Sequence, residues 1–137
     1  MLSPKSMKYR KPYHRHFKRD SCCGTEILFG DYRFQSLEVS WINSQQIESS
    51  RRTLSRYIRR VGKIWIRVFP DKVITRRPTE TRMGTGKGRL KYYTTEMYPR
   101  TIIFEIYRIS KIMVIQAIRV IVSKLPVKIQ IIMKYFI

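Results

Sequence analysis

Apolar residues recur at helical spacing in the segment that runs from residue 44 to residue 61. The stripe consists of Ile47, Leu54, Tyr57, Ile58 and Val61. Asn43 stands where an N-cap belongs and Gln46 at the third helical position, which is the pattern of a capping box. Gly62 is a suitable C-terminal stop. The pattern therefore predicts a helix whose buried side is this stripe.

A second helix is predicted from Ser110, as its N-cap, to about Lys124, with Pro126 ending it. Its apolar positions include Ile112, Ile115, Ile118 and Val122, which we expect to pack on a sheet. The helix is apolar nearly all round, and this suits a buried element better than a surface one.

Most other apolar residues alternate with polar ones or form short runs, which indicates strands. The predicted strands are 25–29, 32–39, 64–69, 73–75, 90–97, 101–107 and 127–132. The pair 90–97 and 101–107 is predicted to form a hairpin around Tyr98-Pro99. In 64–69, Trp65 is expected in the core rather than as a stacking platform for bases.

Two helices between groups of strands favour an α+β fold with a mixed or antiparallel sheet over a doubly wound fold. The 137 residues suit one domain, predicted at residues 21–137, plus a tail. Residues 1–20 form that tail, a basic arm in which Pro4 and Pro12 disfavour a helix. We expect the arm to be extended and to order on a partner.

The formal net charge of +20, from 29 Lys and Arg against 9 Asp and Glu, calls for a polyanionic partner. Nucleic acid is the first choice. The alternative is a membrane-surface protein that uses the basic helix at 110–125. The longest apolar stretch, 112–118, falls far short of the ~20 residues that a membrane span needs.

Arginines are predicted along the outward face of the first helix. With Glu48 as the one i,i+4 acid, opposite Arg52, these charges call for an external anion. Cations and aromatic rings alternate in the arm, a mixture that suits RNA. The predicted RNA-binding residues are Lys5, Lys8, Arg10, Lys11, Arg15, Lys18, Arg51, Arg52, Arg56, Arg59, Arg60, Lys63 and Arg67.

A glycine-rich loop, Arg76–Arg89, is predicted to protrude from the domain. Glycine allows positive φ and lets backbone approach phosphate closely, while an arginine offers a planar fork for phosphate or guanine. Neither the P-loop spacing nor the dinucleotide fingerprint fits these glycines. The residues predicted to contact RNA here are Arg77, Arg82, Met83, Gly84, Gly86, Lys87 and Gly88.

The sequence contains no recognisable catalytic or metal-binding pattern. The nine acids are scattered, and both histidines lie in the arm. Cys22 and Cys23 are adjacent and form no zinc-type spacing. The sequence therefore predicts a protein that is not an enzyme and that uses no metal or cofactor.

Two segments carry a resemblance to a known family. Arg59–Pro70 and Arg82–Gly88 resemble, in order and spacing, the two signatures of the large-subunit ribosomal protein family numbered sixteen in bacteria. Residues 1–5, 77–81 and 123–126 are similar to plastid members, and Tyr93 and Arg100 depart from the family's usual tryptophan and Pro-Gly. Abundant Ile, Lys and Tyr with little Ala suggest an AT-biased organelle gene.

The resemblance implies an α/β hammerhead-like α+β fold that binds large-subunit rRNA. It implies that the Arg82–Gly88 loop points toward the peptidyl-transferase centre and helps shape the region of the A-site tRNA. The implied partners are rRNA, A-site and P-site tRNA and neighbouring large-subunit proteins, with no membrane. A plastid ribosome is the expected location and a mitochondrial one the second choice.

Overall fold

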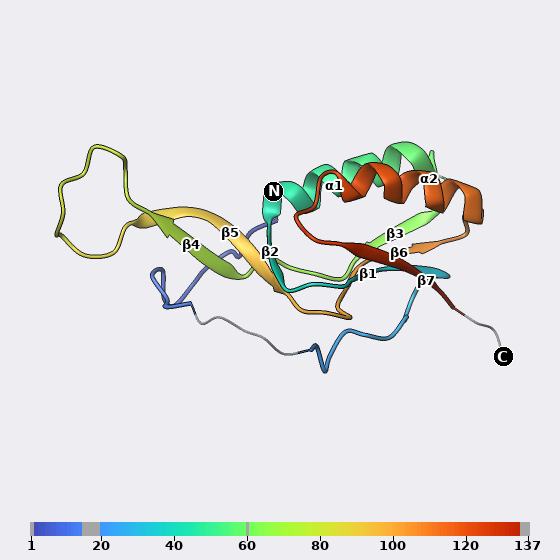
Figure 1. Ribbon diagram of the computed structural model, residues 1–137, viewed down its shortest axis with the longest axis horizontal. Helices are drawn as coiled ribbons and strands as arrows, with labels where there is room; N and C mark the ends of the chain where they lie inside the picture. The colour runs from blue at the N-terminus through green and yellow to red at the C-terminus, as the bar shows by residue number, and fades with distance from the viewer. Residues whose placement is uncertain (1, 15–19, 60, 135–137) are drawn as a thin grey trace.

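In the computed structural model, which describes residues 2–14, 20–59 and 61–134, two helices and seven strands form two antiparallel sheets (Figure 1). This is the predicted α+β class. The elements are β1 (Tyr32–Ser36), β2 (Ser40–Asn43), α1 (Ser44–Ile58), β3 (Lys63–Ile66), β4 (Lys72–Arg76), β5 (Arg89–Met97), β6 (Ile102–Tyr107), α2 (Lys111–Val122) and β7 (Ile129–Met133). The predicted residues Arg15, Lys18 and Arg60 lie outside the described ranges.

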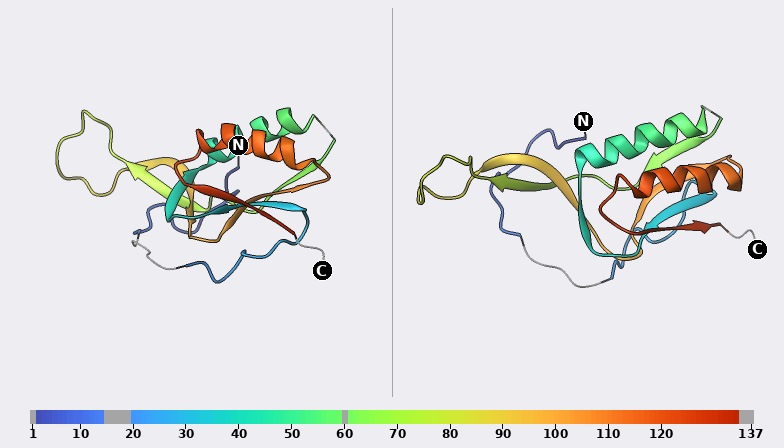
Figure 2. Two further views of the ribbon diagram at one scale, coloured as in Figure 1. Left: turned by 45° about the vertical axis from the view of Figure 1, so that its right-hand side comes forward. Right: turned by 45° about the horizontal axis from the view of Figure 1, so that its top comes forward.

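The first sheet has the strand order β3-β6-β1-β7, and the second has the order β2-β5-β4. Helices α1 and α2 lie side by side over one face of the first sheet (Figures 1 and 2). The core fills the space between these layers, with fully buried Phe34 and Phe104 from the sheet, Ile47 and Leu54 from α1, and Ile121 from α2. Helix α1 also contacts β2 and β5 of the second sheet, whereas β4 and the far part of β5 extend beyond the helix-covered body (Figure 1).

Helix α1 begins where the capping pattern predicts. The backbone N–H of Asn43 donates to Oε1 of Gln46 at 2.9 Å, which is one half of a capping box. The helix ends earlier than predicted, at Ile58, because Arg59 adopts a left-handed φ of 47°. Val61 therefore lies outside the buried stripe and is 70% exposed, whereas Ile47, Leu54 and Ile58 are buried as predicted.

Gly62 does not end the helix; it allows the backbone to pass close to Tyr107 in β6. A Cβ at this position would lie 2.5 Å from the carbonyl oxygen of Tyr107. The absence of a side chain thus lets the start of β3 run against the end of β6, its antiparallel neighbour.

The buried face of α2 differs from the predicted one. Val114, Ala117 and Ile121 are buried, while Ile112 is 70% and Val122 is 42% exposed. Of the four positions expected on the sheet, Ile118 packs against the core, and Ile115 is 37% exposed. Because α2 is apolar on nearly all sides, its periodicity could not select the buried face. Within the described residues, no helix is long and apolar enough to cross a membrane.

The predicted hairpin of 90–97 and 101–107 is wrong. Strand β5 pairs with β2 and β4 in the second sheet, whereas β6 pairs with β1 and β3 in the first. Arg100 has a φ of 70°, and its N–H donates to the carbonyl of Ser36 at 2.8 Å. The turn therefore carries the chain from one sheet to the other instead of folding it back on itself.

Two other predicted strands are corrected. Segment 32–39 is divided: β1 ends at Ser36, and β2 starts at Ser40 in the other sheet. Segment 25–29 is no strand, because the N–H groups of Leu28 and Phe29 donate to the carboxylate of Glu105 rather than to a neighbouring strand. The predicted strands at 64–69, 73–75 and 127–132 correspond to β3, β4 and β7 with shifted ends.

Candidate RNA-binding surfaces

The β4–β5 hairpin carries a loop, residues 77–88, that projects away from the helix-covered body (Figure 1). The strands end in register at Arg76 and Arg89. Residues 77–86 are all exposed, and Met83 is 98% exposed. A loop with so little contact to the body presents both its backbone and its side chains outward.

The loop glycines act in two different ways. Gly84 and Gly86 have φ values of 104° and 78°, which a residue with a Cβ adopts only under strain. Thr85 between them also has a positive φ, 61°. At Gly88 a Cβ would lie 2.6 Å from the carbonyl carbon of Arg76. Gly88 thus closes the hairpin, and the other two glycines shape its tip.

Cations at the hairpin are fixed by carbonyl oxygens. Arg77 donates to the carbonyl of Gly86 through Nε, at 3.1 Å, and through Nη2. Lys87 donates to the carbonyl of Pro12, and Lys11 donates to the carbonyl of Lys87 at 3.0 Å. Within the part of the chain that the structure describes, Arg82 makes no hydrogen bond or ion pair. A neutral oxygen holds a cation without cancelling its charge, so the tip stays positive.

The described part of the N-terminal arm lies against the second sheet and its hairpin. Residues 2–14 form no helix or strand. Nε2 of His14 lies 2.6 Å from the carbonyl oxygen of Val73, and its ring meets Trp41 edge-on at 4.9 Å. Tyr13 places its ring 4.8 Å from Nζ of Lys87. This part of the arm thus contacts the second sheet and the hairpin of the same chain, and ordering by a partner stays a prediction. Lys5, Lys8 and Arg10 are exposed.

Glu48 on α1 binds two arginines rather than the one that was predicted. Arg51 donates to both carboxylate oxygens, at 2.9 and 2.8 Å, and Nε of Arg52 donates to Oε1 at 3.0 Å. These hydrogen bonds, first from Arg51 and then from Arg52, lower the pKa of Glu48 to about 2. Arg56 and Arg59 are exposed and have no acidic partner among the described residues.

Arg67 is placed differently from the other predicted RNA-binding residues. Its guanidinium forms an ion pair with Glu105, whose side chain is fully buried, and lies 5.5 Å from the ring centroid of Phe29. The same carboxylate accepts the N–H of Phe29 at 2.7 Å and that of Gly30 at 3.0 Å. Arg67 therefore has a structural role in the fold, and its contact with RNA stays a prediction. Lys63, at the start of β3, is exposed.

Sequence reasoning missed Glu105, although a signal existed. It is the one acid in the strand Ile102–Tyr107, and its neighbours on both sides are buried and apolar. A lone carboxylate in such a run must find a cation or several N–H donors. Trp65, expected in the core, is half-buried and stacks on Phe29 with a centroid distance of 5.8 Å.

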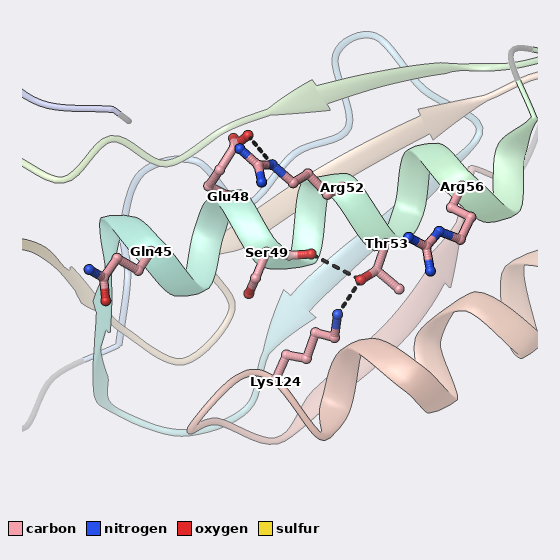
Figure 3. Close-up of a pocket in the computed structure, with 7 residues that line it drawn as sticks. All are labelled: Gln45, Glu48, Ser49, Arg52, Thr53, Arg56 and Lys124. Atoms are coloured by element: carbon pink, nitrogen blue, oxygen red, sulfur yellow. Dashed lines mark hydrogen bonds and ion pairs between the residues drawn. The ribbon is translucent and has the colours of Figure 1, made fainter.

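A groove of about 380 Å³ lies between α1 and the end of α2 (Figure 3). Arg52 and Arg56 line it from α1, and Lys124, which the sequence reasoning did not select, lines it from beyond α2. Nζ of Lys124 donates to Oγ1 of Thr53 at 2.5 Å. The groove thus contains Lys124 in addition to the two predicted RNA-binding residues, Arg52 and Arg56.

Metal-ligating side chains do not gather in the described ranges: no group of three or more His, Cys, Asp or Glu there could hold a metal ion. Cys22 and Cys23 are exposed free thiols.

Comparison with known proteins places this basic α+β chain among the ribosomal proteins. A family model described as "Ribosomal protein L16p/L10e" matches residues 4–132. The chain belongs to the ribosomal protein L16p/L10e family. This is a family of structural proteins rather than enzymes, which agrees with the predicted class and with the resemblance.

Curated relatives cover nearly the whole chain. The chain is 50% identical to "Large ribosomal subunit protein uL16c" of Tetradesmus obliquus over 93% of both sequences. It is 48% identical to the protein of the same name from Brachypodium distachyon, over 95% of this chain and 96% of the relative. For Gracilaria tenuistipitata the identity is 48%, over 98% and 99%. All three carry the name uL16c, the chloroplast form, and none favours the membrane-surface alternative.

Proposed function

We propose that the chain is a structural protein of the large subunit of the plastid ribosome and that it binds large-subunit rRNA through separate basic surfaces. The family match and the uL16c names of its relatives support the subunit and the organelle. The proposed rRNA contacts comprise the described cations of the arm, the outward face of α1 and Lys63. They are Lys5, Lys8, Arg10, Lys11, Arg51, Arg52, Arg56, Arg59 and Lys63.

The loop at 77–88 is proposed to reach the A-site tRNA region near the peptidyl-transferase centre, where A-site and P-site tRNA lie. One observation carries this proposal: the loop projects from the body with uncancelled charge on Arg82 and Lys87 and with exposed backbone at Gly84 and Gly86 (Figure 1). Such a tip can enter folded RNA, because glycine lets the backbone come close to phosphate and arginine binds phosphate or guanine at two points.

The test replaces the tip cations in a ribosome that depends on this chain. A variant with Arg82→Ala and Lys87→Ala should still enter the large subunit, because the arm and α1 keep their cations. Its ribosomes should accommodate aminoacyl-tRNA more slowly. The matched control, Arg108→Ala with Lys111→Ala, removes the same charge at exposed positions of the body.

Two measurements separate the parts of the proposal. Sedimentation after a high-salt wash reports incorporation, and the rate of A-site tRNA binding reports the role of the tip. If the tip variant binds tRNA at the rate of the control, the proposed role of the loop is wrong. If the unaltered chain leaves the large subunit, the ribosomal assignment itself fails.

A further inference from the structure

The groove between α1 and the end of α2 brings together cations that lie far apart in the sequence. Arg52 and Arg56 stand one helical turn apart on α1, and Lys124 reaches α1 at Thr53 from the segment after α2 (Figure 3). Lys124 and Thr53 are 71 positions apart along the chain. The groove therefore exists only when the two helices pack together.

Positive charge in the groove exceeds what its one carboxylate balances. Glu48 lines the groove, but it accepts from Arg51, which lies outside the lining, as well as from Nε of Arg52. Among the described residues, no acid pairs with Arg56 or Lys124. Like charges held close together repel one another unless an anion joins them.

The structure also fixes Lys124 in place. Its Nζ donates to Oγ1 of Thr53, and the hydroxyl of Thr53 donates in turn to the carbonyl of Ser49 at 2.9 Å. One of the three N–H bonds of the ammonium group is used in this way, and the other two are left for an external acceptor. A lysine whose side chain is already held in place loses less conformational freedom on binding a ligand than a lysine with a mobile side chain.

The backbone positions of the two arginines are spaced like the repeat of a nucleic-acid strand. Residues four apart on a helix are separated by about 6 Å along its axis, comparable to the distance between successive phosphates of a strand. Arg52 keeps its Nη nitrogens, and Arg56 its whole guanidinium, for acceptors from outside the described residues. Guanidinium and ammonium groups bind phosphate oxygens through charge-assisted hydrogen bonds.

We propose that this groove, defined by Arg52, Arg56 and Lys124, binds two successive phosphodiester groups of one rRNA strand. The inference rests on the proposed function and deepens it, since it names the chemical groups that this surface binds. It also makes Lys124 a phosphate-binding residue and gives the packing of α2 against α1 a role in recognition.

The experiment measures the binding of the full chain to transcribed plastid large-subunit rRNA, with bulk tRNA as competitor, over a range of salt concentrations. The variant combines Arg56→Gln with Lys124→Gln. The control combines Arg119→Gln with Lys111→Gln, which removes the same charge from exposed positions of α2 outside the groove. The slope of log K against log salt should fall by about 0.7 for each phosphate group that the variant no longer binds. Affinity should fall about tenfold for each strong charge-assisted hydrogen bond that is removed.

The outcomes separate the inference from the function on which it rests. A groove variant whose slope and affinity both fall, while those of the control do not, supports the inference. A groove variant that behaves like the control overturns it and leaves the rRNA-binding function standing. If the unaltered chain shows no preference for rRNA over tRNA, both fail.

Two further measurements guard against a false result. The first is the acetylation of lysines on the unaltered chain, measured by mass spectrometry. Bound rRNA should lower the acetylation of Lys124 and leave that of Lys111 unchanged. If Lys124 reacts equally with and without rRNA, the inference is overturned even if the variant misfolds. Inorganic phosphate is the second probe. Phosphate could stabilise the unaltered chain at constant ionic strength while the groove variant binds rRNA normally. The groove would then be a site for small anions, and the inference would also be overturned.

Discussion

The helix-covered body and the tip of the β4–β5 hairpin hold their cations in different ways. In the body, Arg51, Arg52 and Arg67 donate to carboxylates, and Lys128 pairs with Glu38 at 2.7 Å. At the hairpin, Arg77 and Lys87 donate to backbone carbonyls. Among the described residues, all four ion pairs therefore lie outside the hairpin.

The difference shows how one chain can use some cations to stabilise its fold and keep others charged for a ligand. A carboxylate both positions a cation and neutralises it, which a buried guanidinium such as that of Arg67 requires. A carbonyl positions a cation and leaves its charge for a ligand. The hairpin thus presents a shaped and positive tip. In the body, Arg56 and Lys124 have no acidic partner among the described residues and keep their charge as well.

The largest expected effect comes from the buried ion pair. The substitution Glu105→Gln keeps the size of the side chain but leaves the charge of Arg67, whose side chain is 17% exposed, without its partner. Breaking a buried pair in this way costs about 3–5 kcal/mol. We expect this loss in the free energy of unfolding measured with urea.

The control for that substitution is Glu38→Gln, which removes an exposed pair with Lys128 and should change stability little, because water screens such a pair. If Glu105→Gln is no more costly than the control, the body does not depend on neutralised cations, and the comparison with the hairpin loses its basis.

The hairpin depends instead on backbone geometry, and its two kinds of glycine sharpen that point. Gly88→Ala places a Cβ within 2.7 Å of three backbone atoms of Arg76 and Arg77. Gly86→Ala meets nothing within 4 Å and retains only a positive φ of 78°. Since a left-handed φ costs about 1–2 kcal/mol and a backbone clash adds to the cost of substitution, Gly88→Ala should be the more disruptive.

Hydrogen exchange measures this difference locally. Gly88→Ala should increase the exchange of amides at Arg76 and Arg89, which pair at the end of the hairpin, and leave β1 and β6 protected. Gly86→Ala should affect the tip alone. Equal exchange in the two variants would show that close approach at Gly88 is not what closes the hairpin.

Local signals in the sequence predicted most of the elements. The residues at the start of each helix, Asn43 with Gln46 and Ser110, mark the observed N-termini of α1 and α2. Short runs of strand-forming residues predicted β4 and β5, and glycine spacing predicted the loop between them. These features depend on a few neighbouring residues, which is why a single sequence reveals them.

Partners distant in sequence could not be predicted in the same way. Alternation with a period of two tells which side chains share a face, but not which strand lies alongside, and this produced the wrong pairing of β5 with β6. Arg67 and Glu105 are 38 positions apart, and nothing near Arg67 distinguishes it from the exposed arginines. The apolar surface of α2 likewise left its buried side undecided.

The RNA-binding set shows the same division. Composition and spacing selected the loop and the α1 arginines from local sequence. Of these residues, the ones that the structure describes are exposed, except for Arg51, Lys87 and Gly88, which are half-buried. Lys124 required the packing of two helices to become part of a groove. Arg67 was selected on its charge alone, and its neighbours in the folded chain give it a structural place.

Glu48 offers an effect of intermediate size that depends on pH. Its pKa in the folded chain is about 2, below the ordinary 4.5, because Arg51 and Arg52 donate to it. Its contribution to stability is therefore fully present above pH 4.5 and is lost as the pH falls toward 2. Since these pairs are partly exposed, Glu48→Gln should cost about 1 kcal/mol at neutral pH.

Urea unfolding of both proteins across that pH range checks the sign. The difference in the free energy of unfolding should shrink as the pH falls, and a difference that stays constant would mean that the carboxylate charge is not its source. The same variant should bind rRNA more tightly, because it releases two arginines. If neutralised cations stabilise the fold and free cations bind RNA, Glu48→Gln must bind rRNA more tightly and be less stable.

The smallest expected effect tests the carbonyl-bound cations directly. Arg77→Gln removes a guanidinium that is exposed and holds only the carbonyl of Gly86. Because exposed substitutions usually change stability by about 0.5 kcal/mol or less, urea unfolding should barely distinguish this variant from the unaltered chain. The salt dependence of rRNA binding should nevertheless fall by about 0.7–0.9 in slope if Arg77 contacts one phosphate, while Arg77→Lys should keep the slope. A stability loss as large as that of Glu48→Gln would show that carbonyl-bound cations also support the fold, and the separation between body and tip would then be one of degree.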